Sequence, residues 1–172
     1  VPEPFLVVAT QNPIGTAGTQ MLPEAQLDRF MAQFSIGYPG KEAEMKILMD
    51  RKNEDPMDKV ISIVNRENLV EMKNKVKEVF VHEKMYEYIT DLVRGTRENE
   101  LIKMGISPRG AISICAMGQA WAFMHGRNYV IPQDIRDIFF DAVCHRILIS
   151  PKAHAQGKSI YEILSELVAD TK

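Results

Sequence analysis

Three polar side chains lie at positions where they could act on a transferring phosphate. Asn12 follows the apolar run Phe5–Ala9, Arg29 lies in a helical pattern, and Arg109 follows a helix-start signal. A carboxamide at the carboxyl end of a buried strand can orient a water or a phosphate oxygen, because ligands bind at this edge of open α/β sheets. A guanidinium can stabilise charge that develops on a phosphoryl group, an effect of about three to five decades in rate.

Each of these residues also has an ordinary structural interpretation. Asn12 precedes Pro13 and could form a turn. Arg29 is predicted on the polar side of a helix whose apolar side carries Leu27 and Phe30, which is also the pattern of a surface arginine. Sequence pattern alone leaves both interpretations open.

Arg109 is more informative because of its place at a helix start. Ser107 reads as the cap and Pro108 as the first helical residue, so Arg109 would lie in the first turn. A positive charge there opposes the helix dipole by roughly 0.3–1 kcal/mol. If an anion is bound at this helix start, the positive charge of Arg109 becomes favourable there. The alternative is that Arg109 is solvated and the helix tolerates this small unfavourable interaction.

Other chemistries find little support. The four histidines lack paired ligand spacing, so no metal site is predicted, and no carboxylate pair suits acid-base work. Cys115 and Cys144 lie in apolar helical patterns without a CxxC motif and are expected to be reduced core thiols.

Composition bounds the class of protein. The 172 residues are 45% hydrophobic, with 21 Lys+Arg against 23 Asp+Glu and a net charge of −2, so nucleic acid is not an expected partner. No apolar run approaches the ~18 residues of a membrane span, and the cytoplasm is the expected location. The opening Val1-Pro2-Glu3-Pro4 suggests a chain cut from something longer.

The elements that would position these residues change character along the chain. Phe5–Ala9 has the pattern of a strand buried on both faces of a parallel sheet, although no second such strand is evident. Without neighbours, it should be disordered, be covered by the helical part, or pair with another copy. A helix is predicted from Pro23 through Met31, and Gly37–Gly40 is the clearest domain boundary.

From about Lys41 onward the pattern is entirely helical. The stretch from Ser107 to His125 is apolar nearly all round and is predicted to be the central, most buried helix. Further amphipathic helices are predicted around 43–48, 69–80, 85–93 and 132–143, and a last one follows a capping box at Ser159–Glu162. The predicted fold class is mainly α, a helical bundle preceded by a strand-helix remnant of an α/β unit.

The motifs ATQNP, LPEAQLDRF, IGYP and SPRG, in this order, resemble the MoxR family of AAA+ ATPases. The later VIPQDI and VCHRI are similar to that family's lid domain. The resemblance implies that residues 1–38 end the α/β ATPase core and that 39–172 form the helical lid. The loop after QNP departs from the family, because Gly15–Gly18 replaces its usual acidic residues, which puts in doubt any contact that this loop makes.

The resemblance also implies roles. Asn12 resembles the first sensor near the attacking water, Arg29 the arginine finger that reaches a neighbouring subunit's nucleotide, and Arg109 the second sensor, acting in its own or a neighbouring subunit. The implied cofactors are ATP and Mg²⁺ in the full-length protein, and the implied partners are neighbouring subunits of a ring, expected to be a hexamer, and client proteins that it remodels or activates.

No GxxxxGK[ST] phosphate loop and no apolar strand with a magnesium-binding acidic pair occurs in the sequence. The chain alone is therefore expected to bind no ATP usefully and to be inactive. The alternative is a self-contained helical interaction module that never meets nucleotide, with Arg29 and Arg109 as ordinary surface charges. A phosphate loop within about 100–200 residues upstream would decide for the ATPase.

Overall fold

The structure is a computed structural model that describes residues 3–11, 22–50 and 55–171. Its α-helices are α1 Glu24–Leu27, α2 Lys41–Asp50, α3 Arg66–Lys77, α4 Glu83–Glu98, α5 Pro108–Met124, α6 Pro132–Val143, α7 Pro151–Ala155 and α8 Ile160–Asp170. Two 3₁₀ turns, η1 Pro56–Lys59 and η2 Cys144–Arg146, and two strands, β1 Ile102–Met104 and β2 Leu148–Ile149, complete the described elements.

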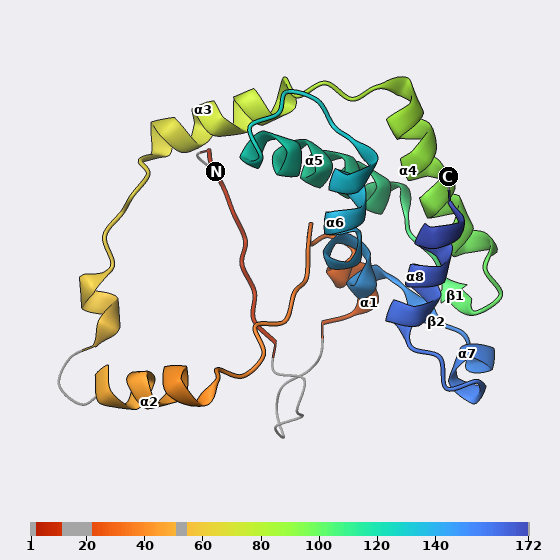
Figure 1. Ribbon diagram of the computed structural model, residues 1–172, viewed down its shortest axis with the longest axis horizontal. Coiled ribbons are helices and arrows are strands. Elements are labelled where there is room, and N and C mark those ends of the chain that lie inside the picture. Colours follow the sequence, from red (N-terminus) through yellow and green to blue (C-terminus); the bar gives the residue numbers. More distant parts are fainter. Residues whose placement is uncertain (1–2, 12–21, 51–54, 172) are drawn as a thin grey trace.

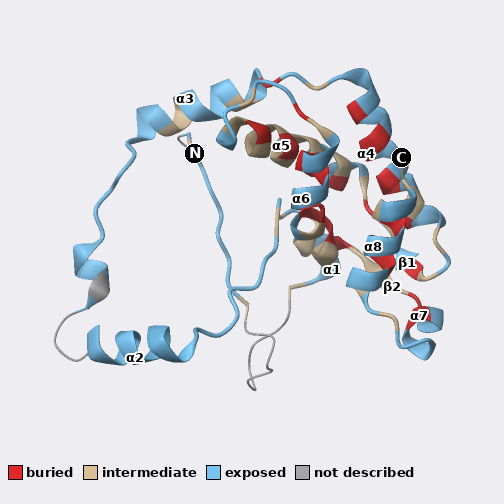
Figure 2. Ribbon diagram, in the orientation of Figure 1, coloured by how far each residue is buried: buried red, intermediate tan, exposed pale blue. Residues whose placement is uncertain are grey.

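The hydrophobic core lies among α4, α5, α6 and α8 (Figure 2). The apolar faces of these helices meet there, as their three-and-four spacing predicts. The large apolar side chains that they shield completely from solvent include Leu92, Ile114, Ile135, Phe139 and Leu164. The predicted helices at 85–93 and 132–143 are therefore confirmed, and their buried faces hold the bundle together.

Side-chain caps define where the helices begin. Ser107 Oγ accepts from the Gly110 amide at 3.3 Å, so α5 starts where the Ser-Pro signal predicts. The capping box of α8 is present as predicted, with Ser159 N–H donating to Glu162 at 2.7 Å and Glu162 N–H donating to Ser159 Oγ at 3.2 Å. These caps satisfy amides that have no partner inside their own helix.

A small antiparallel sheet interrupts the helical region, which the sequence pattern did not predict. β1 pairs with β2, and Ile102 is the partner of Ile149. Ile102 packs with Ala153 and Ile163 in a second apolar cluster beneath α8. Strands of two and three residues are too short to show a period, and only the tertiary fold brings them together.

In Figure 1 α2 and η1 lie apart from the helical body, whereas α3 lies beside one end of α5. Every residue of α2 is exposed, and α3 has no buried residue. The helix predicted at 69–80 is α3, which ends at Lys77 and so does not reach Phe80. The Phe80 side chain is exposed. Phe80 instead forms a parallel bridge with Tyr129 next to the start of α6.

Phe5–Ala9 does not form a buried strand in this structure. The segment is extended and has no ladder partner among the described residues, and the side chains from Phe5 to Val8 are 61–90% exposed. The helical body does not cover it. A strand needs neighbours to satisfy its backbone groups, and the chain supplies none that the structure describes.

α5 holds the central place that its apolar pattern predicts, since it packs against α3, α4 and α6. Its burial is not complete all round, because Ile112 and Met124 on it are 71% and 74% exposed. α4 and α6 each present one buried face and one exposed face.

Candidate functional site

Arg29 lies just after α1, in a turn rather than in a helix. α1 ends at Leu27, and the Arg29 and Phe30 amides close the turn by donating to Gln26 O and Leu27 O at 3.1 and 3.0 Å. The predicted continuation of the helix through Met31 is wrong, because the carbonyls of this turn bond to a side chain from elsewhere. The Arg29 side chain is exposed and its guanidinium has no hydrogen bond or ion pair to a residue that the structure describes.

Arg109 lies in the first turn of α5, as predicted. Its side chain is exposed, and its guanidinium likewise has no bonded partner in the described ranges. Its backbone carbonyl accepts from Ser113 Oγ at 3.1 Å. The helix therefore fixes the backbone of Arg109, while the guanidinium group is exposed to solvent.

The anion at the start of α5 comes from the protein itself. Ser107 Oγ donates to the Asp28 carboxylate, at 2.9 Å from Oδ1 and 3.1 Å from Oδ2, although the two residues are 79 positions apart. A carboxylate at a helix start is favoured by the helix dipole. Asp28, one residue before Arg29, therefore places a negative charge at this helix start.

Arg146 in η2 binds the same turn from the other side. Its side chain is 1% exposed, and its Nε lies 3.3 Å from Asp28 Oδ1, an ion-pair contact without hydrogen-bond geometry. Its guanidinium donates to Phe30 O at 2.5 Å and to Ser113 Oγ at 3.0 Å, and it also donates to Ala142 O. Burial lowers the pKa of Arg146, and the Asp28 carboxylate opposes this shift.

We call this arrangement the junction: residues 28–31, Ser107 and Arg109 at the start of α5, and Arg146. In Figure 1 α1 lies against the end of α6, where η2 begins, and η2 packs on α1. The Gln33 amide adds a further link by donating to Asp141 O at 2.9 Å. The junction is thus the place where the N-terminal part of the chain is attached to the helical bundle.

His145 also belongs to this contact. Its Nε2 lies 3.0 Å from Phe30 O, which accepts a hydrogen bond from the imidazole N–H, while the buried Nδ1 has no partner among the described residues. Burial lowers the pKa of His145, and the charge of Arg146 lowers it further, whereas the Phe30 carbonyl and Asp28 act in the opposite direction. The neutral imidazole is the form that the fold accommodates.

The free energy of unfolding should therefore fall as the pH drops below about 6.5, the usual histidine pKa. The unfolded state binds the proton more readily than the folded state, so stability is lost between that value and the lower folded pKa. The slope due to one group is at most about 1.4 kcal/mol per pH unit. Urea unfolding between pH 5.5 and 7 measures it, and His145→Gln should flatten it; an unchanged slope in that variant would contradict the assignment.

The junction gathers two of the three candidate residues. The Asp28–Ser107 hydrogen bond brings the turn that carries Arg29 close to the helix start that carries Arg109. Asn12 lies outside the described residues. Asp28 and Arg146 were missed by sequence reasoning; the available signal was a basic residue between the apolar positions Val143 and Ile147 at the end of a buried helix.

The charges of the junction suit an anion. Three arginines, Arg29, Arg109 and Arg146, accompany one carboxylate, Asp28, and two of the three guanidinium groups are exposed without a described partner. Arg109 is close enough for its charge to lower the pKa of Arg146. Exposed guanidinium groups are the residues of choice for binding phosphate oxygens, so this part of the junction fits a polyphosphate.

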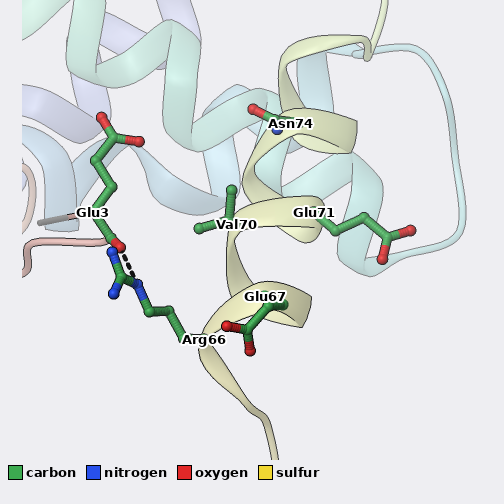
Figure 3. A pocket seen from close by; sticks show the side chains of 6 residues that line it. All are labelled: Glu3, Arg66, Glu67, Val70, Glu71 and Asn74. Atoms are coloured by element: carbon green, nitrogen blue, oxygen red, sulfur yellow. Dashed lines mark hydrogen bonds between the residues drawn. The ribbon is translucent and has the colours of Figure 1, made fainter.

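Elsewhere in the described part of the chain, the hollows are lined by different groups. A hollow between Glu3 and α3 is lined by three glutamates, Arg66, Val70 and Asn74, and Arg66 donates to the Glu3 carbonyl across it (Figure 3). Within the described ranges, no cluster of His, Cys, Asp and Glu could hold a metal ion. No helix in the described part of the chain has both the length and the apolar character needed to cross a bilayer.

Both cysteines are half-buried thiols without a disulfide. Burial raises the pKa of Cys115, and it raises that of Cys144 to about 11. Neither thiol is therefore a thiolate at neutral pH, in agreement with their expected place in the core.

Comparison with known families identifies the two parts of the chain that meet at the junction. Residues 94–167 match the AAA lid domain, and residues 1–32 match the ATPase family associated with various cellular activities (AAA). A solved structure of a candidate ATPase from Cytophaga hutchinsonii superimposes with a TM-score of 0.89 at 34% identity, over 99% of this chain and 55% of that one.

Two curated relatives match over nearly the whole chain. The uncharacterized protein YeaC of Bacillus subtilis is 35% identical over 170 residues, which are 99% of this chain and 53% of that protein. The chaperone MoxR1 of Mycobacterium tuberculosis is 36% identical over 177 residues, covering 98% and 45%. The chain belongs to the AAA+ ATPases of the MoxR type and includes the helical lid domain of that family. It spans about half the length of these relatives.

Proposed function

We propose that the chain is the part of a MoxR-type ATPase that senses and completes a nucleotide site, with residues 1–38 ending the ATPase core and 39–172 forming the lid. The observation that carries this proposal is the junction, where Asp28 and Ser107 bring together the segments that carry Arg29 and Arg109. One relative is named as a chaperone, which supports remodelling or activation of client proteins as the work of the intact protein.

ATP, with Mg²⁺ to neutralise its charge, supplies the phosphoryl group that is transferred to water. In the proposed mechanism Arg29 reaches across to the nucleotide of a neighbouring subunit and stabilises charge that develops on the phosphoryl group. Arg109 contacts phosphate and couples its loss to lid rotation, and Asn12 orients the attacking water. Since the family forms rings, the assembly is proposed to be a homo-oligomer, a hexamer, working in the cytoplasm.

The proposal requires that this chain by itself neither binds ATP usefully nor hydrolyses it. A single charge-assisted hydrogen bond from Arg109 contributes about 1.5–3 kcal/mol, whereas even a millimolar complex needs about 4 kcal/mol. The sequence contains no GxxxxGK[ST] phosphate loop that could supply the difference.

Calorimetric titration of this chain with Mg·ATP should therefore show no binding below the millimolar range. A parallel assay of the intact protein should show hydrolysis. Micromolar binding to the 172-residue chain would contradict the division of labour proposed here, and absence of hydrolysis by the assembled intact protein would contradict the function itself.

A further inference from the structure

One buried guanidinium links the lid to the turn that carries Arg29. Arg146 belongs to the lid, and its donors reach Phe30 O and the Asp28 backbone carbonyl, at 2.5 and 3.3 Å, in the N-terminal part of the chain. Its guanidinium also donates to Met31 O at 3.5 Å and, inside the lid, to Ala142 O and Ser113 Oγ. A planar guanidinium has its donors in a fixed fork, so these contacts set the orientation of the turn as well as its distance from the lid.

The Asp28 carboxylate connects this guanidinium to the start of α5. It accepts from Ser107 Oγ and also pairs with Arg146 Nε. Ser107 caps the helix in whose first turn Arg109 lies, and Asp28 is the immediate neighbour of Arg29. If the start of α5 moves relative to the turn, the Asp28 contacts must either break or move the turn with them. Little else holds the turn in place, because the helix before it, α1, has four residues and none of them is buried.

We propose that Asp28 and Arg146 are positioning residues that couple the helix start bearing Arg109 to the turn bearing Arg29. This inference rests on the proposed function, in which Arg109 senses the nucleotide and Arg29 acts on the nucleotide of a neighbouring subunit. Asp28 and Arg146 do not contact nucleotide. They fix Arg29 in the orientation that it needs, and they change that orientation when the lid moves.

Ser107→Gly in the full-length protein tests the coupling most cleanly. Glycine retains most of the capping function, so α5 should still begin at the same place, but the hydroxyl that binds Asp28 is lost. Because misplacement of a catalytic group by 1 Å can cost about 100-fold, we expect kcat to fall by roughly 10- to 100-fold. KM for ATP should stay within about twofold, since Arg29 acts on the transition state.

Matched variants separate positioning from general damage. Ser107→Thr keeps the hydroxyl and should restore kcat. Ser165→Ala removes a serine hydroxyl that bonds Tyr161 O on α8, away from the junction, and should leave kcat near wild type. Asp28→Ala should lower kcat at least as far as Ser107→Gly. Equal kcat in Ser107→Gly and wild type, or an equal loss in Ser165→Ala, would overturn the inference.

A second measurement does not depend on turnover. Hydrogen exchange of the Arg29 and Phe30 amides in the intact protein, without nucleotide, should quicken about tenfold in Ser107→Gly and not in Ser107→Thr, because local opening of the turn becomes easier. Unchanged exchange would overturn the coupling even if Arg29 proves essential. Conversely, if Arg29→Ala leaves hydrolysis intact while exchange responds as expected, the proposed function fails and the structural link stands.

Discussion

Replacement of Arg29 with Ala in the full-length protein is expected to lower ATP turnover by about three to five decades while the ring stays assembled. The Arg29 side chain is exposed and makes no hydrogen bond or ion pair with a described residue, so its loss should not disturb folding. The expected loss is in kcat, because a guanidinium that acts on developing charge contributes to the transition state far more than to ground-state binding. Steady-state ATPase assays with native mass spectrometry of the same samples measure both quantities.

Arg136→Ala is the matched control for this experiment. Arg136 is an exposed arginine of α6 whose described bonds are to Gln133, at 3.0 and 3.2 Å, so its removal deletes an equal charge away from the junction. It should leave turnover and assembly unchanged. If Arg29→Ala hydrolyses ATP at the wild-type rate, Arg29 is not the residue that completes a neighbouring site, and the interpretation as a surface charge is correct.

Replacement of Arg146 with Ala is expected to lower the free energy of unfolding of the chain by about 3–5 kcal/mol, the cost of breaking a buried ion pair from one side. The Arg146 side chain is 1% exposed, and its removal takes one donor from each of the carbonyls of Phe30 and Ala142, of which Phe30 O keeps the hydrogen bond from His145. Asp28, 28% exposed, would regain water and so limit the loss. Urea unfolding monitored by circular dichroism measures the change.

Two further variants test the reason for this loss. Arg146→Lys should recover little of it, because an ammonium cannot reproduce the planar fork of donors. Arg94→Ala removes an arginine whose pair with Glu98, at 3.1 Å, is 64% and 67% exposed, and should change the free energy of unfolding by less than about 1 kcal/mol. A loss below about 1 kcal/mol in Arg146→Ala would mean that the junction contributes little to stability.

The sequence was most predictive where structure depends on near neighbours. Helix faces such as Tyr88–Leu92, the cap at Ser107 and the capping box at Ser159 all depend on spacings of three or four residues, and the structure confirms them. The sequence was less predictive where the structure of a segment depends on residues far away in the sequence. Phe5–Ala9 is apolar enough for a buried strand, but burial needs neighbouring strands, and the described residues provide none.

The site shows the same division. By residue type and motif, the sequence singled out Asn12, Arg29 and Arg109. It also predicted a helical bundle with one helix that begins at Ser107. Both predictions depend only on residue types and on spacings between residues that are close in the sequence. The sequence could not show that Asp28 supplies the anion at that helix start, or that Arg146 is buried against it. Those contacts join residues 79 and 118 positions apart. Only the packing of α1 against η2 and the start of α5 decides which charges meet, because contact between distant segments depends on the shape of the whole core.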